Sequence, residues 1–106
     1  MVYIINRTIC PSHKANEWAK KYIEQMQKMP PDESLYTTVA NGVKTTTKGI
    51  IGITVSEVKE GKLTEAFDQI TRSNMFYLDI EGLDISNDIF YNPVEALDVL
   101  GLKLPE

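Results

Sequence analysis

The sequence predicts one α+β domain spanning residues 1–106, and three observations carry that prediction. Extended and amphipathic helical stretches alternate in the order β-α-β-β-α-β, and a short helical stretch follows them. Proline and glycine separate most of these stretches. The length suits a single domain, and the apolar (42%) and charged (25%) fractions lie near the averages of globular proteins.

The first strand is expected over Val2–Cys10, where β-branched residues dominate. Both of its faces carry apolar side chains, Ile4 on one and Ile5 on the other, which favours a central strand covered on both sides. Pro11 ends this strand, and Ser12 has the residue type of a helix N-cap.

The first helix is predicted from an apolar stripe at three- and four-residue spacing. Pro30-Pro31 ends it, because proline lacks the N–H that a helix needs and restricts the residue before it. The stripe consists of Ala15, Trp18, Ala19, Tyr22, Met26 and Met29.

Two extended segments come next. Residues 35–39 lead to Asn41-Gly42, a strong turn signal, after which Thr45–Thr47 either close a hairpin or belong to a long loop. Residues 48–58 form the clearest strand, with Ile51, Ile53 and Val55 on one face. The other face is small at Gly52 and Ser56, so something approaches closely there, and a helix is favoured over a ligand or another subunit.

The rest of the chain repeats the pattern. A turn at 60–62 precedes a second amphipathic helix, which runs from about residue 62 to 73 or 75. Residues 76–83 either continue this helix or form a loop, and residues 84–91 are the candidate last strand. Asn92-Pro93 starts a short final helix, and Gly101 stops it.

This order is the ferredoxin-like arrangement, an antiparallel sheet with both helices on one face. The other face is left open, and its apolar side chains require a cover. A closed homodimer that packs sheet against sheet would supply one. The alternative is a monomer whose C-terminal helix covers its own sheet.

The element order resembles the dimeric α/β-barrel superfamily, which includes the antibiotic-biosynthesis monooxygenases. The similarity lies in the strand-to-helix passage through Cys10-Pro11-Ser12-His13, in the long strand 49–58 leading into a helix, and in the close Tyr91-Asn92-Pro93-Val94. It implies a homodimeric barrel. In its haem-degrading members an Asn, a Trp and a His surround the porphyrin; Asn6 matches this pattern, whereas Trp18 and His13 fall too early in the chain.

Cys10 and His13 are the chain's only cysteine and histidine. They could supply two metal ligands, but a structural zinc site needs four. They could instead form a nucleophile and base, with the thiolate favoured by the following helix N-terminus. We favour a half-buried cysteine and an exposed histidine without either role. No metal and no cofactor are expected.

A small-molecule pocket between sheet and helices is the leading functional hypothesis, and whether the protein is an enzyme stays open. A largely apolar pocket with a few polar groups is the usual form of such a site. The alternative is a protein-interaction or scaffold module with a filled core. The candidate ligand-binding residues are Tyr3, Asn6, Trp18, Tyr36, Thr54 and Tyr91.

Composition also limits the partners and the compartment. The net charge of −4 argues against nucleic acid, because phosphate binding needs a basic surface. No apolar stretch is long enough to cross a membrane. A single cysteine, which cannot form an internal disulfide, fits the cytoplasm. Asp79, Glu81, Asp84 and Asp88 lack the spacing of a calcium loop and are expected to be solvated.

Overall fold

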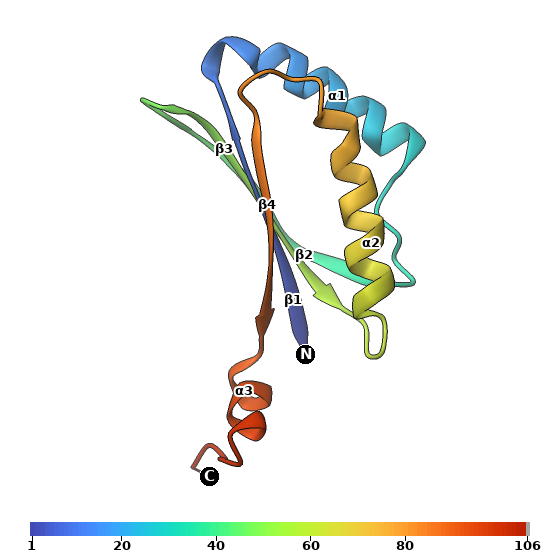
Figure 1. The fold of residues 1–106 in the computed structure, drawn as a ribbon, viewed down its shortest axis with the longest axis vertical. Coiled ribbons are helices and arrows are strands. Elements are labelled where there is room, and N and C mark those ends of the chain that lie inside the picture. The colour runs from blue at the N-terminus through green and yellow to red at the C-terminus, as the bar shows by residue number, and fades with distance from the viewer. Residues whose placement is uncertain (106) are drawn as a thin grey trace.

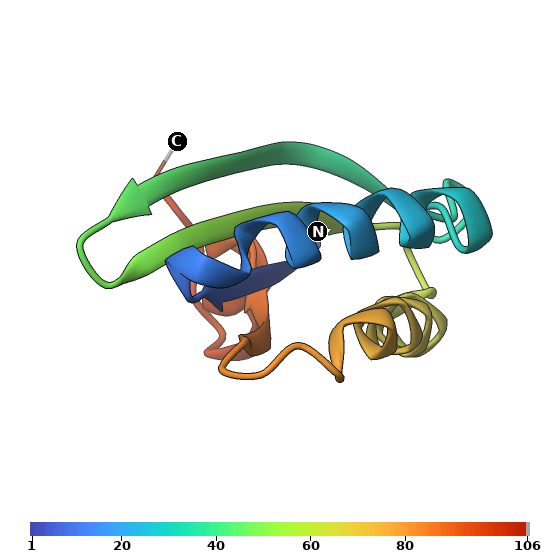
Figure 2. The same cartoon turned by 90° about the horizontal axis from the view of Figure 1, so that it is seen from above.

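The computed structural model describes residues 1–105 and has the ferredoxin-like topology. Four antiparallel strands form one sheet in the order β2-β3-β1-β4, with α1 and α2 on one face (Figures 1 and 2). The elements are β1 (Val2–Cys10), the 3-10 turn η1 (Ser12–Lys14), α1 (Ala15–Lys28), β2 (Tyr36–Thr46), β3 (Gly49–Val58), α2 (Leu63–Asn74), the 3-10 turn η2 (Met75–Tyr77), β4 (Asp84–Tyr91) and α3 (Pro93–Val99).

The sequence prediction is confirmed for most elements. β1 is central, pairing with β3 on one side and β4 on the other. The first and last strands have the predicted bounds, and β3 and α2 begin one residue later than expected. Asn92 caps α3, accepting a hydrogen bond at Oδ1 from the Val94 N–H (2.8 Å), and Gly101 follows the helix at φ +75°.

The predicted turn at Asn41-Gly42 is wrong. Both residues lie inside β2, where they pair with Thr54 and Ile53 of β3. The hairpin turns later, at 47–48. There the Thr46 hydroxyl donates to the Gly49 carbonyl (2.7 Å), and Gly49 takes a φ of +141° that favours glycine. A register shift between Thr38 and Ala40 makes room for an unpaired residue in the long edge strand.

Ser12 does not cap the first helix with its side chain, contrary to expectation. It begins η1 instead, in which the Lys14 N–H donates to the Pro11 carbonyl (2.9 Å), and α1 starts at Ala15. The stretch 76–83, left open by the sequence, continues α2 for one 3-10 turn and then becomes a loop. Tyr77 and Ile80 are buried there, so this loop is tied to the body of the protein.

The apolar core occupies only one end of the space between sheet and helices. It is built from strand residues Ile4, Tyr36 and Val58, packed against Ala66 and Ile70 of α2. Leu63 and Phe67 extend it at the edge. α2 therefore holds its half of the sheet by direct burial of apolar side chains.

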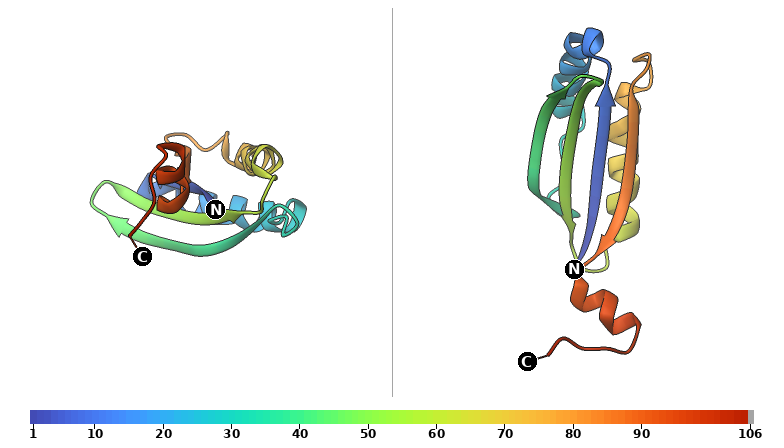
Figure 3. Two further views of the ribbon diagram at one scale, coloured as in Figure 1. Left: turned by 90° about the horizontal axis from the view of Figure 1, so that it is seen from below. Right: turned by 90° about the vertical axis from the view of Figure 1, so that its left-hand side faces the viewer.

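The C-terminal helix does not cover the open face of the sheet, so a self-covering monomer is not what the structure contains. α3 projects beyond the end of the strands along the long axis of the molecule (Figures 1 and 3). Its apolar side chains remain exposed, Val99 at 82% and Leu100 at 72%. Within residues 1–105, no helix is long and apolar enough to cross a bilayer.

Replacing Ile4 with Ala is expected to lower the free energy of unfolding by about 2–5 kcal/mol, because this side chain is 1% exposed and its loss leaves a cavity. Denaturant unfolding followed by circular dichroism measures the change. Ile23→Ala is the control: Ile23 is 57% exposed on α1, and its loss should cost less than about 0.5 kcal/mol. Equal losses at the two positions would contradict this core.

Candidate functional site

A cleft runs between the helices and the sheet beyond the packed core. It consists of two adjoining cavities, of about 520 Å³ and about 320 Å³. The larger lies beneath the first half of α1, and the smaller continues toward the core. Both are lined by Tyr22, Gln25, Asn41, Thr54 and Asn74.

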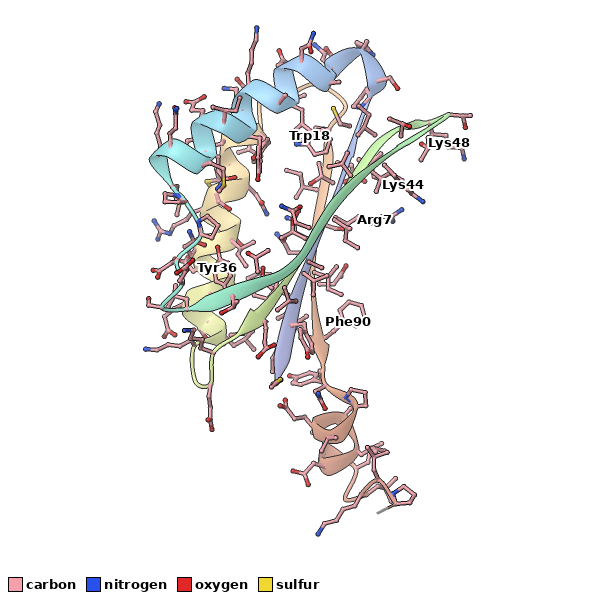
Figure 4. The ribbon with its side chains drawn as sticks, turned by 180° about the vertical axis from the view of Figure 1, so that it is seen from behind. Arg7, Trp18, Tyr36, Lys44, Lys48 and Phe90 are labelled. Atoms are coloured by element: carbon pink, nitrogen blue, oxygen red, sulfur yellow. The ribbon has the colours of Figure 1, made fainter. Side chains whose placement is uncertain are left out.

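One large side chain of α1, Trp18, bridges the space between this helix and the sheet beside the cleft. Trp18 reaches down from α1 to β3, where its ring lies over Gly52 (Figure 4). A Cβ on Gly52 would lie 2.9 Å from Trp18 Cη2, closer than real contacts allow. The sequence expectation that a helix approaches this small face of β3 is confirmed, and the indole forms part of the cavity wall.

The polar groups at the base of the cleft form a connected amide network. Asn6 Nδ2 on β1 donates to Asn87 Oδ1 on β4 (2.7 Å) and to Asn74 Oδ1 at the end of α2 (3.3 Å). Asn6 Oδ1 accepts from the Thr8 hydroxyl (3.3 Å). These bonds tie the centre of the sheet to α2 and fix the orientation of Asn74, which lines both cavities.

A second hydrogen-bonded pair lies in the wall of the larger cavity, where α1 meets η2. The buried Tyr77 hydroxyl donates to Gln25 Oε1 on α1 (3.0 Å), and Gln25 Nε2 donates to the Met29 carbonyl (2.8 Å). Burial, and to a lesser degree the nearby Tyr22, raises the pKa of Tyr77 to about 12. Tyr77 is therefore a neutral hydrogen-bond donor at physiological pH, and it joins η2 to α1.

The cleft walls carry no formal charge. Among the described residues that line the two cavities, none is Asp, Glu, Lys, Arg or His. The polar groups are amides and hydroxyls, including Asn41 Oδ1, which accepts from the Thr54 hydroxyl at 3.2 Å. Aromatic and aliphatic side chains supply the rest. Such a surface offers hydrogen bonds and stacking but no counter-ion for an anion or a cation.

Four of the six predicted ligand-binding residues line the cleft. Asn6 and Tyr36 lie in the smaller cavity, Trp18 in the larger and Thr54 in both. Tyr3 does not line it. An odd number of positions separates Tyr3 from Asn6 on β1, so its side chain points to the opposite face of the sheet. Tyr91 does not either: it lies at the far end of β4 and is 57% exposed.

Several polar cleft residues were not among the predicted ligand-binding residues, among them Gln25, Asn41, Asn74 and Tyr77. Asn41 was interpreted as a turn residue, and Tyr77 lay in the unassigned stretch. Gln25 and Asn74 looked like ordinary polar residues of their helices. One signal was present: Gln25 lies three residues after Tyr22 on the apolar stripe, so it shares the inward face of α1.

Cys10 does not have the surroundings of a reactive thiolate. It is fully buried, and its thiol donates to the Pro11 carbonyl (Sγ to O, 3.3 Å). Burial, with a smaller contribution from Glu17, raises its pKa, which opposes ionisation. His13 is exposed in η1. Within residues 1–105, no group of three or more His, Cys, Asp or Glu is arranged to hold a metal ion.

Fold and cleft together define a ferredoxin-like protein with an uncharged cavity between sheet and helices. No family model matches the sequence, and no curated protein matches it. Among solved structures it is similar to a de novo designed protein, Foldit4, with a TM-score of 0.50, 10% identity, and coverage of 86% of this chain and 96% of that one. That likeness extends to the fold alone.

A second similar structure is that of a candidate monooxygenase from Shewanella loihica PV-4. It has a TM-score of 0.45 and 17% identity, with coverage of 86% of this chain and 92% of that one. No activity is carried over at this level of similarity.

Replacing Gly52 with Ala is expected to displace the Trp18 ring and lower the free energy of unfolding by about 1 kcal/mol, because the new methyl group overlaps the indole. Trp18 is the only tryptophan, so a shift of its emission maximum reports the displacement directly. Gly42→Ala is the matched control on the neighbouring strand, where a Cβ meets nothing within 4 Å. Similar spectra for the two variants would contradict the contact.

Alkaline pH is expected to destabilise the protein through Tyr77. Its pKa in the folded state, about 12, lies above the ordinary value near 10, so the folded form keeps a proton that the unfolded form loses. This contribution is complete below about pH 10 and falls by about 2 kcal/mol as the pH rises toward 12. Tyr77→Phe should flatten the stability curve over that range. Parallel curves for the two proteins would show that Tyr77 is not protected.

Proposed function

We propose that this protein is a cytoplasmic homodimer that binds a small, uncharged organic ligand in the cleft between its sheet and helices. The main support is the larger cavity, whose volume of about 520 Å³ lies within the usual range for small-molecule sites. A scaffold module is expected to have a filled core without a cavity of this size. The protein-interaction alternative is accordingly less favoured.

The lining of the cleft narrows the class of ligand. An ion would lose its hydration without gaining a counter-charge, so charged ligands are disfavoured. Trp18, Tyr22 and Tyr77 favour a ligand with a flat apolar body. Asn41, Asn74 and Gln25 favour one that also carries carbonyl or hydroxyl groups. A neutral aromatic compound with oxygen substituents combines these properties.

Asn41 is the polar residue best placed to select the ligand. It lines both cavities, and its side chain hydrogen-bonds through Oδ1 to Thr54, which leaves its Nδ2 donor without a hydrogen-bond partner among residues 1–105. A buried ligand carbonyl would accept from that donor. Losing one such hydrogen bond costs about 1 kcal/mol or more, because the ligand group is then left unpaired.

Asn41→Ala is expected to weaken ligand binding about 10-fold while leaving the melting temperature nearly unchanged, because Asn41 is exposed to the cleft and not packed in the core. The probe is the neutral dye N-phenyl-1-naphthylamine, whose emission is excited by energy transfer from Trp18 when it binds, and the cavity-filling variant Ala15→Phe localises it to the cleft. A library of neutral phenols and quinones then competes with the dye.

Two variants control this experiment. Asn16→Ala removes an exposed amide from α1 outside both cavities and should bind like the unaltered protein. Ala15→Phe fills part of the larger cavity and should abolish energy transfer, whereas Ala96→Phe on α3 should not. If no neutral compound binds, or if Ala15→Phe leaves binding intact, the proposal is overturned and a protein-interaction role is favoured.

A further inference from the structure

The two cavities of the cleft differ in polarity, and the strand register explains the difference. On the helix side of the sheet, one row of paired residues is polar on every strand: Asn41 on β2, Thr54 on β3, Asn6 on β1 and Asn87 on β4. The larger cavity extends from this row toward Trp18, and the smaller one extends toward the core. Figure 4 shows these two ends of the cleft, with Trp18 under α1 and Tyr36 beside α2.

Ser56 continues the polar surface toward the core. It pairs with Thr38 on β2 and Ile4 on β1, and it lines the smaller cavity but not the larger one. Its side chain is almost fully buried, at 3% exposure. Among the hydrogen bonds within residues 1–105, none involves the Ser56 hydroxyl, whereas the hydroxyl of Thr54, two positions earlier on β3, donates to Asn41 Oδ1 (3.2 Å).

A serine hydroxyl this deeply buried requires a partner, because taking it out of water without a hydrogen bond is costly. Within residues 1–105, every side-chain nitrogen or oxygen that is fully enclosed has such a partner. The Ser56 hydroxyl has none, so it is not enclosed by protein and opens into the smaller cavity. An unpaired hydroxyl in the wall of a cavity indicates a position for a ligand group.

Two other hydroxyls of the smaller cavity are already engaged with the protein. The Tyr36 hydroxyl donates to Gln69 Oε1 (2.6 Å), and the Ser73 hydroxyl donates to the Ile70 carbonyl (2.7 Å). Each has therefore used its only proton. Neither can donate a hydrogen bond to a ligand without losing its contact in the protein.

Asn74 supplies a second donor without a partner. Its Oδ1 accepts from Asn6 Nδ2 (3.3 Å), and its Nδ2 makes no hydrogen bond within residues 1–105. Asn74 lines the same cavity as Ser56. The matching ligand group is therefore an acceptor, and a carbonyl oxygen has two lone pairs and no proton that would oppose these donors.

We propose that the smaller cavity is the subsite for a carbonyl oxygen of the ligand, with Ser56 as its main donor and Asn74 as the second. The apolar ring of the ligand then lies in the larger cavity, against Trp18. This inference rests on the ligand site of the proposed function and adds the orientation of the ligand and the group recognised at its inner end. It narrows the ligand to neutral aromatic ketones, esters and amides.

The opposite orientation is disfavoured by the same groups. A ring placed against Ser56 would leave the buried hydroxyl unpaired. The carbonyl would then lie in the larger cavity, where the two hydroxyls that the smaller cavity does not share are already donating. The Thr8 hydroxyl donates to Asn6 Oδ1 (3.3 Å), and the Tyr77 hydroxyl donates to Gln25 Oε1 (3.0 Å).

Two compounds of nearly the same shape test this subsite. In 2-acetylnaphthalene a carbonyl oxygen stands where 2-isopropenylnaphthalene has a methylene group. Displacement of N-phenyl-1-naphthylamine measures both dissociation constants. Replacing Ser56 with Ala is expected to shift their ratio about 5- to 10-fold in favour of the hydrocarbon, because only the ketone loses a hydrogen bond. Differences in hydration between the compounds cancel when the two proteins are compared.

Two serine variants control this measurement. Ser73→Ala changes the same cavity but removes a hydroxyl whose proton is already used, so both affinities should change alike and their ratio should stay the same. Ser86→Ala alters an exposed residue on the opposite face of the sheet and should leave both dissociation constants unaltered. Without ligand, Ser56→Ala should not lower the melting temperature, because the hydroxyl has no protein partner to lose.

Infrared spectroscopy gives a readout that does not depend on affinity. With 2-acetylnaphthalene labelled at its carbonyl carbon, the carbonyl stretch of the bound ketone should lie at a lower frequency than in hexane, because a hydrogen bond weakens the C=O bond. In Ser56→Ala the stretch should move back toward its position in hexane. In Ser73→Ala it should stay where it is in the unaltered protein.

The outcomes separate this inference from the proposed function. If both compounds displace the dye but the ratio shifts no more in Ser56→Ala than in Ser73→Ala, or shifts only in Asn41→Ala, the carbonyl subsite is overturned and the ligand site stands. A markedly lower melting temperature of Ser56→Ala would show that the hydroxyl serves the fold, and it would also overturn the subsite. If neither the dye nor either compound binds the unaltered protein, the ligand site itself is overturned, and the subsite with it.

Discussion

The contact between Trp18 and Gly52 determines how the two layers of this protein are spaced. The indole reaches from α1 to β3 and packs on the backbone of Gly52. Any other residue at this position would place its Cβ 2.9 Å from the ring atom Cη2. At the other end of the sheet, α2 packs directly through Ala66 and Ile70. α1 thus contacts the sheet through a single large ring, whereas α2 packs closely against it. The cleft is the space that remains between these two contacts.

The amide network makes this open arrangement compatible with a stable fold. A cavity at the layer interface exposes polar groups that a packed core would exclude, and each needs a partner. Asn6, Asn74 and Asn87 satisfy one another across three elements, and Gln25 and Tyr77 do the same between α1 and η2. The unused donors and acceptors that remain face the cavity. The same side chains therefore stabilise the cleft walls and, under the proposed function, would select an uncharged, hydrogen-bonding ligand.

The two faces of the sheet carry different side chains. Alternation along each strand places polar and small residues such as Asn6, Thr54 and Gly52 toward the helices, and branched apolar residues such as Ile5 and Ile53 away from them. A second copy of this chain, as in the proposed homodimer, would cover the apolar side chains of the outer face.

The order of elements, the bounds of β1 and β4 and the faces of β3 could be predicted from the sequence, because alternation, helical spacing and proline positions are local signals. The position of the hairpin turn could not, since Asn41-Gly42 is a good turn but pairing with Thr54 and Ile53 stabilises a longer strand. Alternation already places Tyr3 and Asn6 on opposite faces of the first strand, but only the tertiary structure decides that the helices cover the face of Asn6. Gln25 and Asn74 became cleft residues through tertiary contacts between α1, η2 and α2, which no local pattern of residues encodes.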